Sequence, residues 1–373
     1  MRIRAFVGPS LMALAGAVAL ILVVSPPLLA FAQGSGLYEQ RNLVSDIPGL
    51  ARLTDANLVN PWGLSHSPTG PWQVSDNGTG VSTQYTRNGG AVPPVVIIPL
   101  PGGAPGGAPT GNVFNGTSDF VVTRGAASGP SRFVFATEDG TLSGWNPNVD
   151  STHAIIVVDR SMVGAGAVYK GLAIGRNSSG NVLFATNFRF GTVEIFNDKF
   201  QLVRSFTDPQ LSADCPLPNL PDQCFAPFGV QNIGGLIYVT YALQNAAKHD
   251  DVSGAGNGFV DVFDTNGSLL RRFAAHGPLN SPWGLVLAPA GFGVFSSDLL
   301  VGNFGDGRIT AYDVGTGAVR GQLQTGEGRP LTIPGLWGLA FGNGGLAGDS
   351  NKLFFAAGIN DEADGLFGSI EPA

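Results

Sequence analysis

The sequence predicts an all-β protein, a six-bladed β-propeller of four-stranded blades, because a unit with a Gly-centred apolar opening recurs along it. Each copy continues with a second apolar run, a turn, and a third run that ends in an aromatic residue. The 55 glycines and 26 prolines, against only 13% charged residues, suit many short strands joined by tight turns. The openings are Trp62-Gly63-Leu64, Lys170-Gly171-Leu172, Phe228-Gly229-Val230, Trp283-Gly284-Leu285 and Trp337-Gly338-Leu339, with a degenerate copy near Asp119-Phe120-Val121.

The aromatic residues that end the third runs give the number of blades. In the copy that begins at Trp283, we expect strands over residues 283–288, 298–302, 308–312 and 318–323. An Asp306-Gly307 hairpin turn joins the second strand to the third. The second runs are almost continuously apolar, as in strands that neighbouring blades bury on both faces. Six blades follow from the six aromatic ends, which are Tyr85, Trp145, Phe196, Phe263, Tyr312 and Phe367.

The two ends of the chain are predicted to meet in the last blade. The sixth copy stops after its third strand, residues 366–370, and lacks an outer strand. Residues 38–44 precede every blade and carry Leu43 and Val44 on an otherwise polar stretch. We expect this N-terminal strand to close the last blade, because such closure removes an exposed sheet edge.

The first 32 residues are typical of a secretory signal peptide. Arg2 and Arg4 precede an apolar run over residues 11–24, and Ala30-Phe31-Ala32 offers a small-residue cleavage site. An uncleaved membrane anchor is the alternative, because residues 11–32 are long enough to cross a bilayer. We expect cleavage after Ala32. The remaining residues 33–373 then form an exported single-domain chain without a transmembrane span, which we expect to be a monomer in the periplasm, in the medium or at the cell surface.

The charge balance restricts the partners. Removal of residues 1–32 takes away two arginines and no acid, which leaves 18 basic against 27 acidic residues. This negative balance argues against nucleic acid and against anionic membrane surfaces.

Two further segments lie outside the blade pattern. Cys215 and Cys224 are close together in a Pro-rich stretch, and an even pair of cysteines in an exported protein indicates a disulfide. The Gly- and Pro-rich residues 101–111 are of low complexity and are predicted to form a surface loop between the first two blades.

Function is expected at one end of the propeller. The turns between first and second strands and between third and fourth strands share one end and are short. The other end, here called the irregular end, holds the loops between second and third strands and the crossings between blades. Its longest insertion, residues 244–258, carries Lys248, His249, Asp250 and Asp251. Two interpretations stay open: a solvated acidic loop, or a ligand loop in which the Asp pair binds a cation and His249 or Lys248 binds an anionic group.

A second candidate site lies where the second strands end, near the propeller axis. Successive blades place Asp76, Glu138, Asn187 and Asn303 there. Such oxygen ligands suit Ca²⁺ or another divalent cation, and the alternative is that each side chain caps its own strand.

The chain lacks the common catalytic signatures. It has no Gly-x-Ser-x-Gly elbow, no His-Glu-x-x-His pair, no phosphate loop and no dinucleotide fingerprint. Of its four histidines, His249 and His276 belong to the irregular end, and His249 is the candidate general base.

Several runs resemble an uncharacterised bacterial family of exported proteins, some of which carry a C-terminal Pro-Glu-Pro-type sorting signal. The runs are Asn60-Pro61-Trp62-Gly63-Leu64, residues 75–80 and above all Tyr238-Val239-Thr240-Tyr241 with Lys248-His249-Asp250-Asp251. The resemblance spans residues 40–370 and implies no established activity, and this sequence ends at Ala373 without such a signal. More distantly, the blades are similar to NHL repeats and to lactonase and gluconolactonase propellers. That similarity implies a divalent cation at the axis, held by Glu, Asn and Asp side chains.

Two functions are therefore open. In the first, an exported propeller binds a small molecule, a glycan or a protein on its irregular end. The alternative is a metal-dependent hydrolase or lyase of the lactonase type, with a divalent cation at the axis and His249 as the base.

Overall fold

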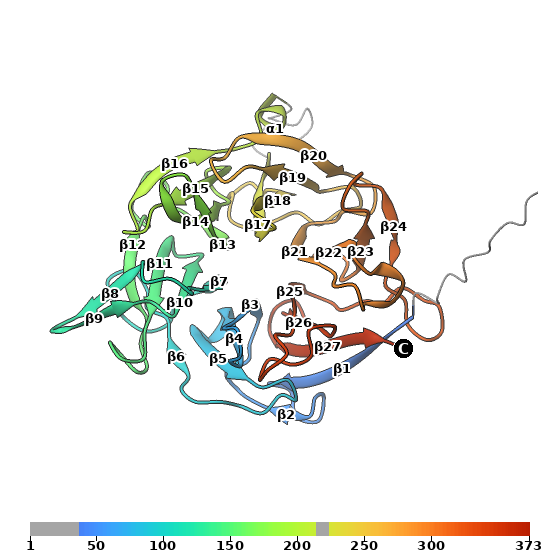
Figure 1. Cartoon of the computed structure of the whole chain (residues 1–373), viewed down its shortest axis with the longest axis horizontal. Coiled ribbons are helices and arrows are strands. Elements are labelled where there is room, and N and C mark those ends of the chain that lie inside the picture. The colour runs from blue at the N-terminus through green and yellow to red at the C-terminus, as the bar shows by residue number, and fades with distance from the viewer. Residues whose placement is uncertain (1–36, 214–223) are drawn as a thin grey trace, which may run out of the picture. The chain divides into compact units, whose positions relative to one another are not determined.

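The structure, a computed structural model, describes residues 37–213 and 224–373. The predicted signal peptide, residues 1–32, lies outside this range. So does Cys215, and the Cys215–Cys224 disulfide therefore stays a prediction. Within the compact unit formed by residues 34–373, six β-sheets are arranged around a common axis, as Figure 1 shows. The predicted six-bladed propeller is confirmed.

The blades follow one another along the chain, each with its first strand next to the axis (Figure 1). Blade 1 contains β3 (Pro61–His66), β4 (Trp72–Asp76), β5 (Val81–Tyr85) and β6 (Val96–Ile97). Blade 2 contains β7 (Pro109–Phe114), β10 (Phe133–Thr137), β11 (Thr141–Trp145) and β12 (Ile155–Asp159). Blade 3 contains β13 (Tyr169–Asn177), β14 (Gly180–Asn187), β15 (Thr192–Phe196) and β16 (Leu202–Phe206).

The second half of the ring repeats this arrangement. Blade 4 contains β17 (Phe225–Ile233), β18 (Leu236–Leu243), β19 (Phe259–Phe263) and β20 (Leu269–Ala275). Blade 5 contains β21 (Pro282–Leu287), β22 (Leu299–Asn303), β23 (Ile309–Tyr312) and β24 (Val319–Gln322), close to the predicted bounds. Blade 6 contains β25 (Leu336–Phe341), β26 (Leu353–Ala357) and β27 (Leu366–Pro372). All six predicted aromatic residues lie on third strands, and none is more than 3% exposed, so they pack between blades.

The N-terminal strand closes blade 6 as predicted. Strand β1 (Tyr38–Ser45) pairs antiparallel with β27, from Tyr38 opposite Pro372 to Ser45 opposite Leu366. Strand β2 (Leu53–Thr54) then pairs parallel to β1, which makes this sheet five-stranded. Val44 is fully buried, while the polar residues between Tyr38 and Leu43 stay partly or largely exposed. The closure therefore buries apolar side chains as well as pairing the backbone of β27.

A few short elements complete the fold. Strands β8 (Val121–Arg124) and β9 (Ala127–Pro130) form a separate hairpin beside blade 2. Two 3₁₀ turns, η1 (Asn77–Thr79) and η2 (Gly293–Phe295), and one five-residue helix, α1 (Pro209–Ala213), lie between strands. No helix of the described residues is long and apolar enough to span a membrane.

The opening of blade 2 was predicted in the wrong place. Its innermost strand is β7, and the Gly-centred opening is Thr110-Gly111-Asn112 rather than the segment near Phe120. Residues 109–111 are buried, so the predicted surface loop ends before them. Because Thr110 and Asn112 are polar, this copy lacks the apolar signature of the others.

Six equivalent glycines explain why the opening recurs. A Cβ added to Gly111 would lie 2.4 Å from the backbone nitrogen of Leu172 in blade 3. A Cβ on Gly229 would lie 2.1 Å from the carbonyl oxygen of Trp283, and one on Gly338 would lie 2.4 Å from that of Trp62. The innermost strand of each blade thus approaches the next blade too closely for any side chain at this position. The contact between Gly338 and Trp62 carries the series from blade 6 back to blade 1.

Candidate functional site

Two residues of each blade face the axis at the irregular end, and the strand register identifies them. Pro61 pairs with Asp76 in blade 1, Tyr169 pairs with Asn187 in blade 3, and the equivalent pairs recur in the other blades. Because side chains alternate along a strand, the residue after each member of such a pair points the other way. The residues that follow the first-strand members are Trp62, Thr110, Lys170, Phe228, Trp283 and Trp337. Those that follow the second-strand members are Asn77, Glu138, Phe188, Ala242, Phe304 and Gly358.

Aromatic side chains fill six of these twelve positions. The rings of Trp62 and Trp337 stack with centroids 3.4 Å apart, and Trp283 meets both edge-on. Phe304 stacks on Trp337 at 4.0 Å, and Phe188 and Phe228 join the same buried cluster. The tryptophans were predicted to serve mainly in packing between blades. They also form an apolar floor across the axis, which excludes water from the polar groups beside it.

Lys170 is the one charged residue among the six first-strand positions, and its side chain is only 2% exposed. Its ammonium group forms an ion pair with Glu138 of blade 2 and lies 3.5 Å from Oδ1 of Asp250 in blade 4. It also lies 5.1 Å from the centroid of the Trp62 ring, within cation–π range. Burial would lower the pKa of Lys170, but the Glu138 and Asp250 carboxylates outweigh burial and raise this pKa. Lys170 therefore stays protonated in this setting.

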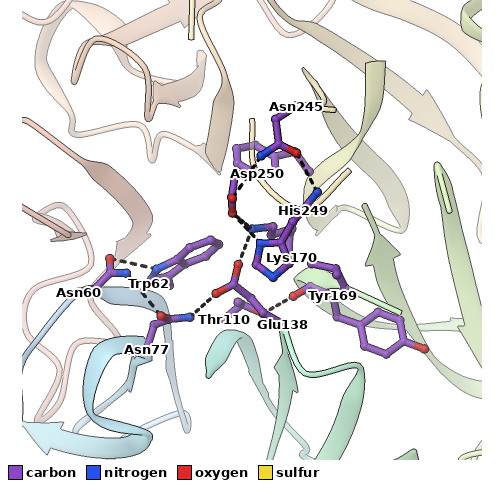
Figure 2. A network of polar contacts seen from close by, with 12 residues as sticks. Asn60, Trp62, Asn77, Thr110, Glu138, Tyr169, Lys170, Asn245, His249 and Asp250 are labelled. Carbon is purple, nitrogen blue, oxygen red and sulfur yellow. Dashed lines mark hydrogen bonds and ion pairs between the residues drawn. The ribbon is translucent and has the colours of Figure 1, made fainter. Parts of the chain in front are cut away.

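Glu138 links the ammonium group to blade 1. Its other carboxylate oxygen, Oε2, accepts a hydrogen bond of 2.9 Å from Nδ2 of Asn77. Asn77 lies close to Asn60, whose Oδ1 accepts hydrogen bonds from the indole nitrogens of Trp62 and Trp337 at 3.1 and 3.2 Å. The indole of Trp283 donates to the carbonyl oxygen of Lys170. The aromatic floor and the charged groups therefore form one connected network (Figure 2).

His249 and Asp250 come from the long insertion of blade 4. Nδ1 of His249 lies 2.7 Å from Oδ1 of Asp250, and this hydrogen bond together with the charge of Lys170 lowers the pKa of Asp250 to about 2. The base of the loop is fixed, since Gln244 bridges to Asp251 and the amide of Val252 donates to the carbonyl oxygen of Leu243. Figure 2 shows His249 and Asp250 beside Lys170 and Glu138, on the opposite side from Asn77. We call Glu138, Lys170, His249 and Asp250 the axial network.

Strained backbone is concentrated around the axial network. Ten non-glycine residues of the described chain have a left-handed φ, a conformation that costs about 1 kcal/mol or more and often marks functional sites. Seven of them lie at the irregular end: Asn60, Lys248, His276, Ser281, Asn360, Asp361 and Glu362.

Three of these strained residues are consecutive and bring Glu362 of blade 6 towards the axial network. Burial raises the pKa of Glu362, and the charges of Glu138 and Asp251 raise it further, while Asn60 and Lys170 oppose the shift. Its Oε1 atom is buried without a hydrogen-bond partner among the described residues. Asp251, which was predicted to bind a ligand, is a second acid whose pKa is raised by burial. Carboxyl groups with raised pKa values and one with a lowered pKa, Asp250, are thus found at the same end.

Of the four predicted axial metal ligands, the structure brings only Glu138 into the axial network. Asp76 is buried and accepts the amide of Thr83 within its own blade. Asn187 donates to Glu194 of its own blade, and Asn303 donates to Pro278 and Asp306. These three side chains stabilise strand ends, which is the alternative that the sequence left open. The residues present do not fit a four-ligand ring at the axis.

A register difference of one residue explains this outcome. Asp76, Asn187 and Asn303 are the paired members of their second strands, whereas Glu138 follows the paired residue Thr137. Glu138 therefore points to the axis and the other three point away.

Sequence reasoning missed Lys170, although a signal was present. Lys170 was assigned to the blade opening, where the equivalent residues are aromatic in four of the other five blades. A lysine in an otherwise apolar buried series requires a buried counter-ion, and that requirement points to a polar site at the axis.

Comparisons with known proteins agree with this fold. No family model matches the chain. Two proteins of Acanthamoeba polyphaga mimivirus, the uncharacterised proteins R648 and L690, are each 32% identical over 330 residues. The match covers 88% of this chain in both cases, with 78% of R648 and 84% of L690.

Solved propellers are similar in structure at low sequence identity. A gluconolactonase from Xanthomonas campestris has a TM-score of 0.53 at 12% identity, covering 92% of each chain. A catalytically inactive virginiamycin B lyase from Staphylococcus aureus with quinupristin has a TM-score of 0.51 at 12% identity, covering 90% of this chain and 99% of that one. At such identities the likeness shows the fold alone.

Proposed function

The chain belongs to the family of the uncharacterised mimivirus proteins R648 and L690, and on this premise we propose that it binds a small polar molecule at the axial network. The observation that carries the proposal is the buried ion pair between Lys170 and Glu138. A buried ion pair gains little stability over apolar residues of similar volume, because the desolvation cost offsets the attraction. Trp283 and Trp337 fill the equivalent positions of other blades with apolar rings, so packing alone does not require a lysine there.

The surroundings support a small molecule rather than a large partner. A pocket of about 330 Å³, near the lower end of the usual range for ligand sites, opens beside Glu362. Phe304 lines this pocket and also stacks on Trp337 of the aromatic floor. A ligand in this pocket would therefore contact Phe304 of the apolar floor and the carboxyl group of Glu362, whose pKa is affected by the charges of Glu138 and Lys170. An extended protein or glycan surface is less well matched, because the cation of the network, Lys170, is only 2% exposed.

We also propose that the chain is exported. The support is the form of residues 1–32, in which a basic start and an apolar run precede Ala30-Phe31-Ala32.

The test is a variant that removes both charges of the ion pair, Lys170→Met with Glu138→Gln. We expect its free energy of unfolding in urea to equal that of the wild type or to exceed it. Ligand-observed NMR with panels of carboxylic acids, primary amines, monosaccharides and lactones should then find compounds that bind the wild type. Their affinity for the variant should be lower by about tenfold or more, which corresponds to about 1.4 kcal/mol.

A matched variant controls for the substitutions themselves. Lys199→Met with Glu327→Gln makes the same changes at exposed positions, and it should bind as the wild type does. Loss of about 3–5 kcal/mol of stability in the axial variant would mean that the ion pair holds the fold together. Equal binding to the wild type and the axial variant, or no binding by any panel, would also contradict the proposal.

A second candidate function rests on one further observation. Ligand atoms of Glu138, His249 and Asp250 lie within 4.8 Å of one another and could hold a divalent cation. A bound cation would supply the charge for a metal-dependent hydrolase or lyase, in which His249 is one of the ligands rather than a free base. Lys170 already neutralises two of the three groups, so a cation would have to displace its ammonium group. The test is thermal melting of the chelated protein before and after Ca²⁺, Mg²⁺, Mn²⁺ or Zn²⁺ is added back. A cation that binds should raise the melting temperature, and His249→Gln should abolish this rise.

A further inference from the structure

We propose that a second pocket, between blades 3 and 4, binds the carboxylate or phosphate group of an organic anion. The pocket has a volume of about 260 Å³ and is lined by Arg189, Thr192, Thr207 and Lys248, with Phe190 and Phe225. We call it the basic pocket. This inference rests on the proposed function, because it identifies the charge of one part of the ligand.

The charge of the basic pocket differs from that of its surroundings. Arg189 and Lys248 are both cationic, and no carboxylate lines the pocket among the described residues. The pocket beside Glu362 has the opposite composition, since Asp306, Asp361 and Glu362 line it without a basic residue. In a chain with more acids than bases, a pocket whose described lining holds two cations and no acid favours an anion.

The donors of the basic pocket are available. Arg189 donates from Nη1 to the carbonyl oxygens of Ala165 and Gly166, at 2.7 and 3.3 Å, which fixes the guanidinium group. In the described chain its remaining nitrogens make no hydrogen bond, and neither Arg189 nor Lys248 forms an ion pair. Thr192 and Thr207 add two hydroxyl groups to the lining. A planar guanidinium, an ammonium and two hydroxyls are the groups that recognise carboxylate and phosphate oxygens.

The loop geometry connects the basic pocket to the axial network. Lys248 has a φ of 54°, and the amide of His249 donates to Oδ1 of Asn245, so a tight turn separates two consecutive side chains. Lys248 lines the basic pocket, while His249 contacts Asp250 in the axial network. The basic pocket and the axial network are thus linked by two consecutive residues of one loop. Phe190 and Phe225 provide apolar surface for the body of such a molecule.

The experiment uses three probes of similar size: benzoate, phenyl phosphate and the neutral benzyl alcohol. Isothermal titration calorimetry of the wild type should detect binding of the two anions. Benzyl alcohol should bind with an affinity lower by about tenfold or more. The affinity of the variant Lys248→Met with Arg189→Gln for the two anions should be lower than that of the wild type by at least the same factor. The exposed Lys199→Met, at the other end of the propeller, should bind them as the wild type does. A preference for benzoate or for phenyl phosphate then decides between carboxylate and phosphate.

Three outcomes would overturn the inference: equal affinity of the double variant and the wild type, benzyl alcohol binding as tightly as benzoate, or no anion binding to the wild type at millimolar concentration. Failure here is distinguishable from failure of the proposed function. The axial variant Lys170→Met with Glu138→Gln tests the axial network separately. If the basic pocket does not bind anions but the proposed function is correct, ligands of other charge would still bind at the axial network.

Discussion

Two ionic clusters of the described residues, each with one cation between two carboxyl groups, are built in opposite ways. In the axial network the cation, Lys170, is buried, and the outer carboxylate, Asp250, is 60% exposed. In blade 4, by contrast, Arg272 is 22% exposed and pairs with Asp208 and Asp261, whose side chains are fully buried.

The origin of the residues differs as well. Asp261 and Arg272 are opposite each other on β19 and β20, and Asp208 lies shortly after β16 of the neighbouring blade. The axial network instead contains residues of blades 2, 3 and 4. Two of them, Glu138 and Asp250, are 112 positions apart in the sequence. A cluster whose carboxyl groups are fully buried between adjacent strands stabilises the packing of two blades. A cluster assembled from several blades, with one side open, suits a binding site.

The largest effect that tests this comparison is expected from Arg272→Met. The substitution leaves the carboxyl groups of Asp208 and Asp261 buried without a cation, so the free energy of unfolding should fall by about 3–5 kcal/mol. Urea denaturation measures this change. The exposed Arg204→Met on β16 is the matched control and should change stability by less than about 0.5 kcal/mol. If both variants were equally stable, the blade 4 cluster would have no structural role.

A second effect, of intermediate size, concerns pH. Burial raises the pKa of Asp261 to about 7, the charge of Asp208 adds to the rise, and Arg272 opposes it. An unfolded Asp has a pKa of about 4. Between these values the folded state holds a proton that the unfolded chain has released, so stability decreases as the pH rises, by up to about 1.4 kcal/mol per pH unit. Asp261→Asn should remove this slope in urea denaturation between about pH 4 and pH 7. A slope unchanged in the variant would assign it to other groups.

The smallest effect is expected at the open side of the axial network. The pKa of Asp250 is lowered to about 2, so its ionised form stabilises the fold above pH 4 and this contribution is lost as the pH falls through 2. Because Asp250 is exposed, Asp250→Asn should cost no more than about 1 kcal/mol at pH 7. The difference from wild type should vanish in acid, as thermal melting can show. The exposed Asp349→Asn is the control. A cost of Asp250→Asn as large as that of Arg272→Met would remove the distinction between the clusters.

The fold was predictable because each blade repeats the same local pattern. The aromatic ends of the third strands and the incomplete last copy were sufficient to predict six blades and the closure by Tyr38–Ser45. Blade 2 was misplaced at its opening, because the close approach of blades requires only Gly111 there and leaves its neighbours free to be polar.

The site was predictable only in part, because the direction of a side chain depends on register. Glu138 and the loop carrying His249 and Asp250 were identified from the sequence. Asn187 and Asn303 look equivalent to Glu138 in the sequence, yet a shift of one residue turns them towards their own blades. The importance of Lys170 depends on a contact with Asp250, 80 residues away, which no local pattern reveals.

The closure of blade 6 also sets the order in which the ring can be completed. Strand β1 is synthesised before every blade, and its partner β27 is synthesised after them all. The hydroxyl group of Ser45 finds its acceptor, the carbonyl oxygen of Gly365, only 320 residues later. Until then β1 has only the short parallel pairing of Val44 and Ser45 with β2, and strands with unpaired edges associate readily with other chains. Because pairing across so long a separation is slow, we expect the pairing of β1 with β27 to be a late step in completing the ring.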